Sequence, residues 1–174
     1  MPRNLEIKAR IQDIQAAESI AKSLPATFSG CLEQVDTYFR VPQGRLKLRE
    51  INQKEAELIF YKRDEKSNQR MSDFTIYPCM DSKSLMHLLE AAFGILQVVE
   101  KRRTLYMYNA TRIHLDEVKE LGSFIELETP INESNGDVRA ITDFLVEKFV
   151  LRDADYITCS YLDLMQTKLE VHTP

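Results

Sequence analysis

Charged side chains recur at every second position along several segments of this chain. In residues 4–11, Glu6, Lys8 and Arg10 alternate with apolar residues. This alternation is typical of a β-strand with one polar and one apolar face. In a single strand the polar face is most often solvent-exposed, but here the same pattern returns on strand after strand. We therefore expect the polar faces to line one shared cavity.

The charged positions fall into a basic set and an acidic set. The basic set can bind phosphate oxygens through charge-assisted hydrogen bonds. It comprises Lys8, Arg10, Lys47, Arg49, Lys62, Lys101, Arg103 and Arg112. The acidic set offers the hard oxygen ligands that Mg²⁺ or Mn²⁺ prefers. It comprises Glu6, Asp116, Glu126 and Glu128. Glu126 and Glu128 are neighbours on one strand face and would repel each other unless a cation lay between them.

The charged and titratable positions also allow two simpler interpretations. The basic faces could be solvated surfaces without a ligand, although enclosing so many charges with no ligand would be costly. His114 lies among the polar positions of a strand and could act as a ligand or an acid–base group. A lone histidine in such a place is more often a bystander.

The apolar pattern predicts the elements that position these side chains. We expect helices to begin after the capping residues Asp13, Asp81 and Asp137, and a short helical element within residues 156–169. Strands are expected over residues 4–11, 35–41, 44–51, 56–63, 72–78, 97–108, 111–116 and 122–129. This makes an α+β domain over residues 1–174. With its polar face inward, the sheet should form a closed antiparallel eight-stranded β-barrel, with helices packed outside.

Composition excludes several classes of protein. The chain has 174 residues, of which 44% are hydrophobic and 29% charged, so it is globular rather than disordered. A formal net charge of −4 argues against a general nucleic-acid binder, which usually has a basic excess. Cys31, Cys79 and Cys159 lie far apart without a zinc-type spacing, which favours free thiols in a reducing compartment. No apolar run approaches a membrane span, so we expect a cytoplasmic protein without a membrane partner, either monomer or homodimer.

Six motifs, taken together and in chain order, resemble the CYTH superfamily. These triphosphate tunnel metalloenzymes include class IV adenylate cyclases and thiamine triphosphatases. The motifs are Glu6-Ile7-Lys8, Val35-Asp36-Thr37-Tyr38-Phe39, Leu46-Lys47-Leu48-Arg49, Glu100-Lys101-Arg102-Arg103, Arg112-Ile113-His114-Leu115-Asp116 and Leu121-Gly122-Ser123-Phe124-Ile125-Glu126-Leu127-Glu128. The segments at residues 6–10 and 36–39 are most similar to the class IV adenylate cyclase branch.

The resemblance implies a closed tunnel that binds a triphosphate with divalent metal. By position, the resemblance implies that the metal ligands would be Glu6, Asp116, Glu126 and Glu128. It implies that the phosphate oxygens would be held by Lys8, Arg49, Lys62, Lys101 and Arg103. Lys47 and Arg112 would be weaker candidates for the same role. Glu6 and Lys8 would be the catalytic residues. The chain departs from the family signature at Asn4, where the first of two glutamates is expected. An asparagine offers a carbonyl oxygen but no charge, which weakens one metal site.

Three functions are compatible with such a tunnel. We favour metal-dependent hydrolysis of a triphosphate such as ATP, thiamine triphosphate or inorganic triphosphate, because hydrolysis needs only a bound polyphosphate and a water. The alternatives are a class IV adenylate cyclase that makes cyclic AMP from ATP, and a non-catalytic nucleotide- or polyphosphate-binding module, which Asn4 favours. An organic group is expected to be sensed at the tunnel mouth, near residues 64–71 and Tyr161.

Overall fold

The computed structural model describes residues 4–63, 72–131 and 136–171. The segment 64–71, which is one of the two places where we expect an organic group to be sensed, lies outside the described residues.

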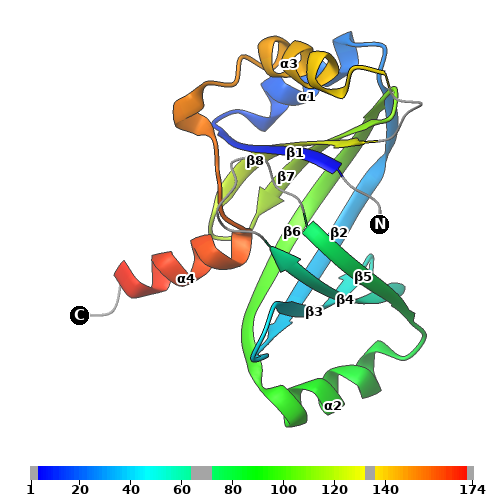
Figure 1. Ribbon diagram of the computed structural model, residues 1–174, viewed down its shortest axis with the longest axis vertical. Helices are drawn as coiled ribbons and strands as arrows, with labels where there is room; N and C mark the ends of the chain where they lie inside the picture. Colours follow the sequence, from blue (N-terminus) through cyan, green and yellow to red (C-terminus); the bar gives the residue numbers. More distant parts are fainter. Residues whose placement is uncertain (1–3, 64–71, 132–135, 172–174) are drawn as a thin grey trace.

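Eight antiparallel strands form one strongly curled sheet in the order β1-β8-β7-β6-β2-β3-β4-β5 (Figure 1). The strands are β1 (Asn4–Ile11), β2 (Thr27–Phe39), β3 (Arg45–Ile51), β4 (Glu55–Arg63), β5 (Ser72–Cys79), β6 (Ile95–Tyr108), β7 (Thr111–Val118) and β8 (Gly122–Pro130). The long pair β2 and β6 joins the two halves of the sheet. The predicted α+β class is confirmed.

The prediction of a closed barrel is wrong. Strands β1 and β5 are the two edges of the sheet, and within the described residues they do not pair with each other. Part of the free edge of β1 is taken by another segment. The backbone N–H of Ile157 donates to the carbonyl of Lys8 at 2.8 Å, and Ala9 forms a β-bridge with Tyr156. Because these groups of β1 already have partners, they are not available to β5, and the sheet curls without closing.

Three helices cover the apolar parts of the convex face of the sheet. Helices α1 (Ile14–Ser23) and α3 (Val138–Lys148) lie over β1, β7 and β8, and α2 (Ser82–Phe93) packs at the other end (Figure 1). The predicted caps Asp13, Asp81 and Asp137 each accept a backbone N–H from the first turn of their helix, as expected. The concave face carries most of the charged positions predicted above, whereas Glu33, Arg102 and Glu117 form exposed ion pairs on the convex face.

Helix α4 (Tyr161–Val171) follows a short 3₁₀ turn, η2 (Asp153–Asp155), and projects away from the sheet after its first turns (Figure 1). Its residues Tyr161, Leu162 and Met165 pack against Tyr38 and Phe124 of the sheet. In the part of the chain that the structure describes, no helix is long and apolar enough to cross a membrane.

The apolar layer between the sheet and α1 and α3 should carry much of the stability. Leu127 is fully buried there, so Leu127→Ala should lower the free energy of unfolding by about 2–5 kcal/mol through lost contacts and a cavity. Urea denaturation measures this change. The matched control is Leu88→Ala on the exposed side of α2, where we expect a change within about 0.5 kcal/mol. Equal effects of the two variants would contradict this packing.

Candidate functional site

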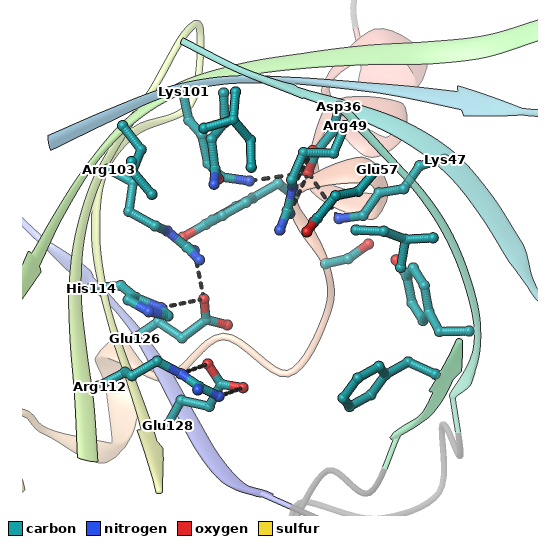
Figure 2. Close-up of a pocket in the computed structure, with 18 of the residues that line it drawn as sticks. Asp36, Lys47, Arg49, Glu57, Lys101, Arg103, Arg112, His114, Glu126 and Glu128 are labelled. Carbon is teal, nitrogen blue, oxygen red and sulfur yellow. Dashed lines mark hydrogen bonds and ion pairs between the residues drawn. The ribbon is translucent and has the colours of Figure 1, made fainter. Parts of the chain in front are cut away.

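The concave face encloses a cavity of about 560 Å³, and every strand of the sheet contributes to its wall. Figure 2 shows charged side chains of both signs arranged around one central space. Its cations are Lys8, Lys47, Arg49, Lys101, Arg103 and Arg112, and its carboxylates among the described residues are Glu6, Asp36, Glu57, Glu126 and Glu128. The wall is therefore close to neutral, and its charges form mutual ion pairs.

Asp36 on β2 is the centre of one ion cluster. Its carboxylate accepts from Arg49 Nε at 2.7 Å and Nη2 at 2.9 Å, from Lys47 Nζ at 2.9 Å and from Lys101 Nζ at 3.1 Å. Only 1% of Asp36 is exposed. Burial alone would raise the pKa of its carboxyl, but Arg49, Lys101 and Lys47 hold that pKa well below its usual value. One ionised carboxylate thus serves three cations, of which Lys47 and Lys101 are buried and Arg49 is partly buried.

Burial has the opposite consequence for the two lysines of this cluster. Desolvation, with Arg49 close by, lowers the pKa of the Lys47 ammonium well below its usual value. Desolvation likewise lowers the pKa of Lys101 to about 8, although Asp36 partly compensates. An anion that entered the cavity would favour the charged form of both lysines.

Arg103 on β6 is the centre of a second cluster. Its guanidinium forms a two-pronged pair with Asp116 at 2.7 and 2.6 Å and also donates to Glu126 at 2.8 Å. The hydroxyl of Tyr161 donates to Asp116 at 2.8 Å. Asp116 is fully buried behind Arg103 and does not line the cavity. Its role here is to hold Arg103 in place and to attach the start of α4.

Glu126 on β8 also pairs with β1 and β7. Lys8 Nζ lies 3.0 Å from Glu126 Oε1 and 4.1 Å from the centre of the Tyr161 ring. Burial favours the protonated form of Glu126, but Lys8, His114 and Arg103 keep its pKa well below the usual value. His114 Nδ1 lies 3.5 Å from Glu126 Oε2, which is longer than a normal hydrogen bond. Burial, aided by Arg103, lowers the pKa of His114.

Glu128 lies further along the same face and directly opposite Glu6 in the strand register. Arg112 bonds both oxygens of Glu128, at 2.7 and 3.0 Å. The amide of Asn4 donates to Glu128 Oε1. A glutamate at position 4 could not make this hydrogen bond when ionised, because a carboxylate only accepts.

Most of the predicted phosphate-binding residues line the cavity, but Arg10 and Lys62 do not. Arg10 lies at the end of β1, where it donates to the Leu121 carbonyl at 2.6 Å and covers the Phe124 ring. Lys62 is exposed, because the neighbouring positions Ile59 and Tyr61 are the ones that face the cavity. Of the predicted metal ligands, Glu6, Glu126 and Glu128 line the wall and Asp116 does not.

A protein-family profile described as the CYTH domain matches residues 2–161. The chain belongs to the CYTH domain family. A comparison with curated protein sequences finds no match.

Solved structures share the fold of this CYTH domain at low sequence identity. The PH1012 protein of Pyrococcus horikoshii OT3 matches with a TM-score of 0.82 and 24% identity, over 92% of this chain and 98% of that one. A candidate adenylate cyclase from Vibrio parahaemolyticus matches with a TM-score of 0.76 and 19% identity, over 94% of this chain and 98% of that one. At these identities the comparisons establish a common fold and nothing finer.

Sequence reasoning missed several residues that line the cavity of this CYTH domain. Asp36 and Gln34 belong to neither predicted set, although they alternate with Tyr38 along one face of β2. The sequence pattern favours a bystander role for His114, yet its ring lines the cavity and lies next to Glu126. Asp36 could have been found from the sequence, because it is a charged residue at an inward position and pairs across the strands with Arg49 of β3.

The carboxylates of this CYTH domain fit a divalent cation by chemical type but are not gathered around one. Glu6, Glu126 and Glu128 are hard oxygen donors on adjacent strands, and the opposed pair Glu6 and Glu128 needs a cation nearby. Over residues 4–63, 72–131 and 136–171, no three His, Cys, Asp or Glu side chains lie close enough together to hold a metal ion. Arg112 provides the local positive charge instead, so a metal would have to take Glu128 from it.

The lowered pKa of Lys101 predicts a pH-dependent anion affinity. In the protein without ligand, Lys101 loses its proton as the pH rises through about 8. Above that pH an anion can make this contact only if Lys101 takes up a proton, so the affinity should fall as the pH rises. Such a contact is worth about 1.5–3 kcal/mol, or roughly ten- to a hundredfold in affinity. Calorimetric titration of inorganic triphosphate between about pH 7 and pH 9.5 measures the loss.

The control for this titration is Lys101→Arg, which stays charged over the whole range. The ratio of the two affinities cancels the titration of the ligand itself. The same decline in both proteins would show that Lys101 does not control it.

Proposed function

We propose that this CYTH domain binds a triphosphate together with a divalent cation in the cavity and hydrolyses the terminal phosphoryl group. The observation that carries the proposal is the paired charge of the wall, where six cations and five carboxylates from the described part of the chain face one space. Burying this many charges is costly unless they serve a ligand.

The pairing explains why each ligand would strengthen the binding of the other. A triphosphate alone would have to compete with Asp36, Glu126 and Glu128 for the cations of the wall. A divalent cation alone would have to compete with Lys8 and Arg112 for the carboxylates. When both enter, the cations can transfer to phosphate oxygens and the carboxylates to the metal, so no charge is left without a partner.

The two ion clusters divide the work of holding the triphosphate. Lys47, Arg49 and Lys101 approach it from β3 and β6, and Asp36 keeps all three in position. Lys8, Arg103 and Arg112 approach it from β1, β6 and β7. Asp116 holds Arg103 by two hydrogen bonds, so the guanidinium of Arg103 would need little reorganisation to bind a phosphate.

Glu6, Glu126 and Glu128 would hold Mg²⁺ or Mn²⁺. When bound, the ion would neutralise negative charge on the phosphoryl oxygens. Glu6 and Lys8 are successive inward residues of β1 and are the pair that we assign to the chemical step. Glu6 accepts a proton from the attacking water, whose oxygen bonds to the terminal phosphorus. The bond from that phosphorus to the bridging oxygen breaks, and the diphosphate leaves with its electron pair. Lys8 stabilises the charge on the transferred group.

Two alternatives use the same cavity. In a class IV adenylate cyclase, the ribose 3′-hydroxyl would attack the α-phosphorus of ATP and release pyrophosphate, which the motif style of residues 6–10 and 36–39 favours. In a binding module there would be no turnover, which the hydrogen bond from Asn4 to Glu128 favours, because it occupies a carboxylate oxygen that a metal would use.

A substrate panel decides between these functions. Inorganic triphosphate, ATP and thiamine triphosphate are each incubated with Mg²⁺ or Mn²⁺, and the products are identified. We expect orthophosphate from at least one substrate. Cyclic AMP with pyrophosphate would instead establish a cyclase, and saturable binding without product would establish a binding module.

The metal assignment makes a separate prediction. Glu128→Gln keeps the size of the side chain, but it removes the charge and replaces one oxygen that accepts from Arg112 or Asn4 by an amide group that only donates, so we expect turnover to fall by at least about a hundredfold. Initial rates over a range of Mg²⁺ concentrations measure the effect. The control is Glu117→Gln, an exposed residue on the opposite face of β7. Unchanged turnover in Glu128→Gln, or full wild-type activity in excess EDTA, would rule the assignment out.

A further inference from the structure

The lysines of the cavity wall lie near tyrosine rings. Lys8 Nζ lies 4.1 Å from the centre of the Tyr161 ring, and Lys101 Nζ lies 5.7 Å from the same centre. Lys47 Nζ lies 5.4 Å from the centre of the Tyr38 ring. An ammonium group within about 6 Å of an aromatic centre is attracted to the face of the ring. The ring of Tyr161 therefore attracts lysines from both β1 and β6, and its contact with Lys8 is the shortest of these.

The ring of Tyr161 is held in place by its own contacts. Tyr161 is the first residue of α4, and only 5% of it is exposed. Its hydroxyl donates to Asp116 at 2.8 Å, and its ring packs against Phe124 with 4.9 Å between the ring centres. Burial, together with Asp116 and Glu126, raises the pKa of the phenol well above its usual value, so Tyr161 stays uncharged. Because the hydroxyl is already bonded, it is not available to the organic group that we expected Tyr161 to sense.

Two neighbours hold Lys8, and they differ in what else they can bind. The first is Glu126, whose Oε1 lies 3.0 Å from Lys8 Nζ. In the proposed function a divalent cation takes this carboxylate, so Lys8 loses its ion pair. The second is the ring of Tyr161, which Mg²⁺ or Mn²⁺ does not bind, because these ions prefer oxygen ligands. Of these two neighbours, only the ring can hold Lys8 both before and after a metal binds.

The side chain of Lys8 needs such a neighbour because it is long and flexible. A lysine ammonium is carried on four methylene groups, and fixing them costs conformational entropy. If neither Glu126 nor a ring held it, Lys8 could leave the position in which it lines the cavity, and an incoming triphosphate would have to bring it back. A cation–π contact shifts such an equilibrium roughly two- to thirtyfold.

We propose that Tyr161 is a positioning residue, whose ring keeps the Lys8 ammonium directed into the cavity when a divalent cation takes Glu126. This inference rests on the proposed function, in which Lys8 stabilises the charge on the transferred phosphoryl group. Tyr161 acts through Lys8 and does not itself need to touch the triphosphate. The start of α4 thus has a role in the reaction beyond packing against the sheet.

The test compares Tyr161→Phe, which keeps the ring, with Tyr161→Leu, which removes it. Both variants lose the hydroxyl, so the difference between them reports the ring. Calorimetry measures the affinity for an imido-bridged inorganic triphosphate, which resists hydrolysis, with and without saturating Mg²⁺. With Mg²⁺ we expect Tyr161→Leu to bind about three- to tenfold more weakly than Tyr161→Phe. Without metal the two should agree within about twofold, because Glu126 still holds Lys8.

Two further comparisons control this test. Tyr77→Leu, an exposed change on β5, should bind like wild type in both buffers. In protein that carries Lys8→Met, no ammonium is left for the ring to hold, so Tyr161→Phe and Tyr161→Leu should then bind equally with Mg²⁺. This second comparison also decides the case in which wild-type protein binds only when Mg²⁺ is present. Unfolding midpoints are measured for every variant, and Tyr161→Met takes the place of Tyr161→Leu if the latter does not fold.

Three results would overturn the role of Tyr161. Equal weakening by Tyr161→Leu with and without Mg²⁺ would mean that the ring only attaches α4. Equal affinities of Tyr161→Leu and Tyr161→Phe with Mg²⁺ would mean that Lys8 needs no ring. A difference that persists in Lys8→Met would mean that the ring acts on another group, such as Lys101. The failure of the proposed function looks different, because wild-type protein would then bind no triphosphate with or without Mg²⁺.

Discussion

The ion pairing of the buried Asp36 carboxylate is the interaction on which the rest of the cavity depends. Three cations, Lys47, Arg49 and Lys101, converge on it from two other strands. Without a buried negative charge, these cations would repel one another across a space too enclosed for water to screen them. Asp36 therefore allows β2, β3 and β6 to curl together with their charged faces inward, and it holds the cations where an incoming anion can meet them.

The opposite wall follows the same logic with a different geometry. Asp116 holds Arg103 from behind and also bonds Tyr161, so the start of α4 is tied to the ion network as well as to the apolar cluster around Phe124. Glu126 and Glu128 instead face the cavity, where their partners Lys8 and Arg112 can exchange them for other ligands. Asp36 and Asp116 are almost completely buried and position cations, whereas Glu126 and Glu128 face the cavity and are available for exchange. This division supports the joint binding of a triphosphate and a divalent cation.

Much of the architecture is predictable from the sequence, because alternation and capping are local properties. Three aspartates predict the starts of α1, α2 and α3. In most strands, apolar residues alternate with charged ones, and this alternation distinguishes the apolar face from the polar face. The start of β2 escapes prediction, since residues 27–34 contain Gly30 and lack a clear apolar face. Lys62 is wrongly predicted to face the cavity, because β4 is rich in apolar residues and its alternation does not show which face is inward. A shift of one residue moves a side chain to the other face, and in β4 the inward position is Tyr61.

The sequence by itself determined the family, the α+β class and the presence of one strongly charged sheet face, since each depends on residue types at short or fixed spacings. The tertiary structure alone decided that the sheet stays open, because the segment at Tyr156 and Ile157 pairs with β1 only after the chain has folded back. It also decided which carboxylates pair with which cations. Asp116 and Glu126 both contact Arg103, yet one is buried behind it and the other faces the cavity. That distinction depends on strand register and sheet curvature, which bring together residues far apart in the chain.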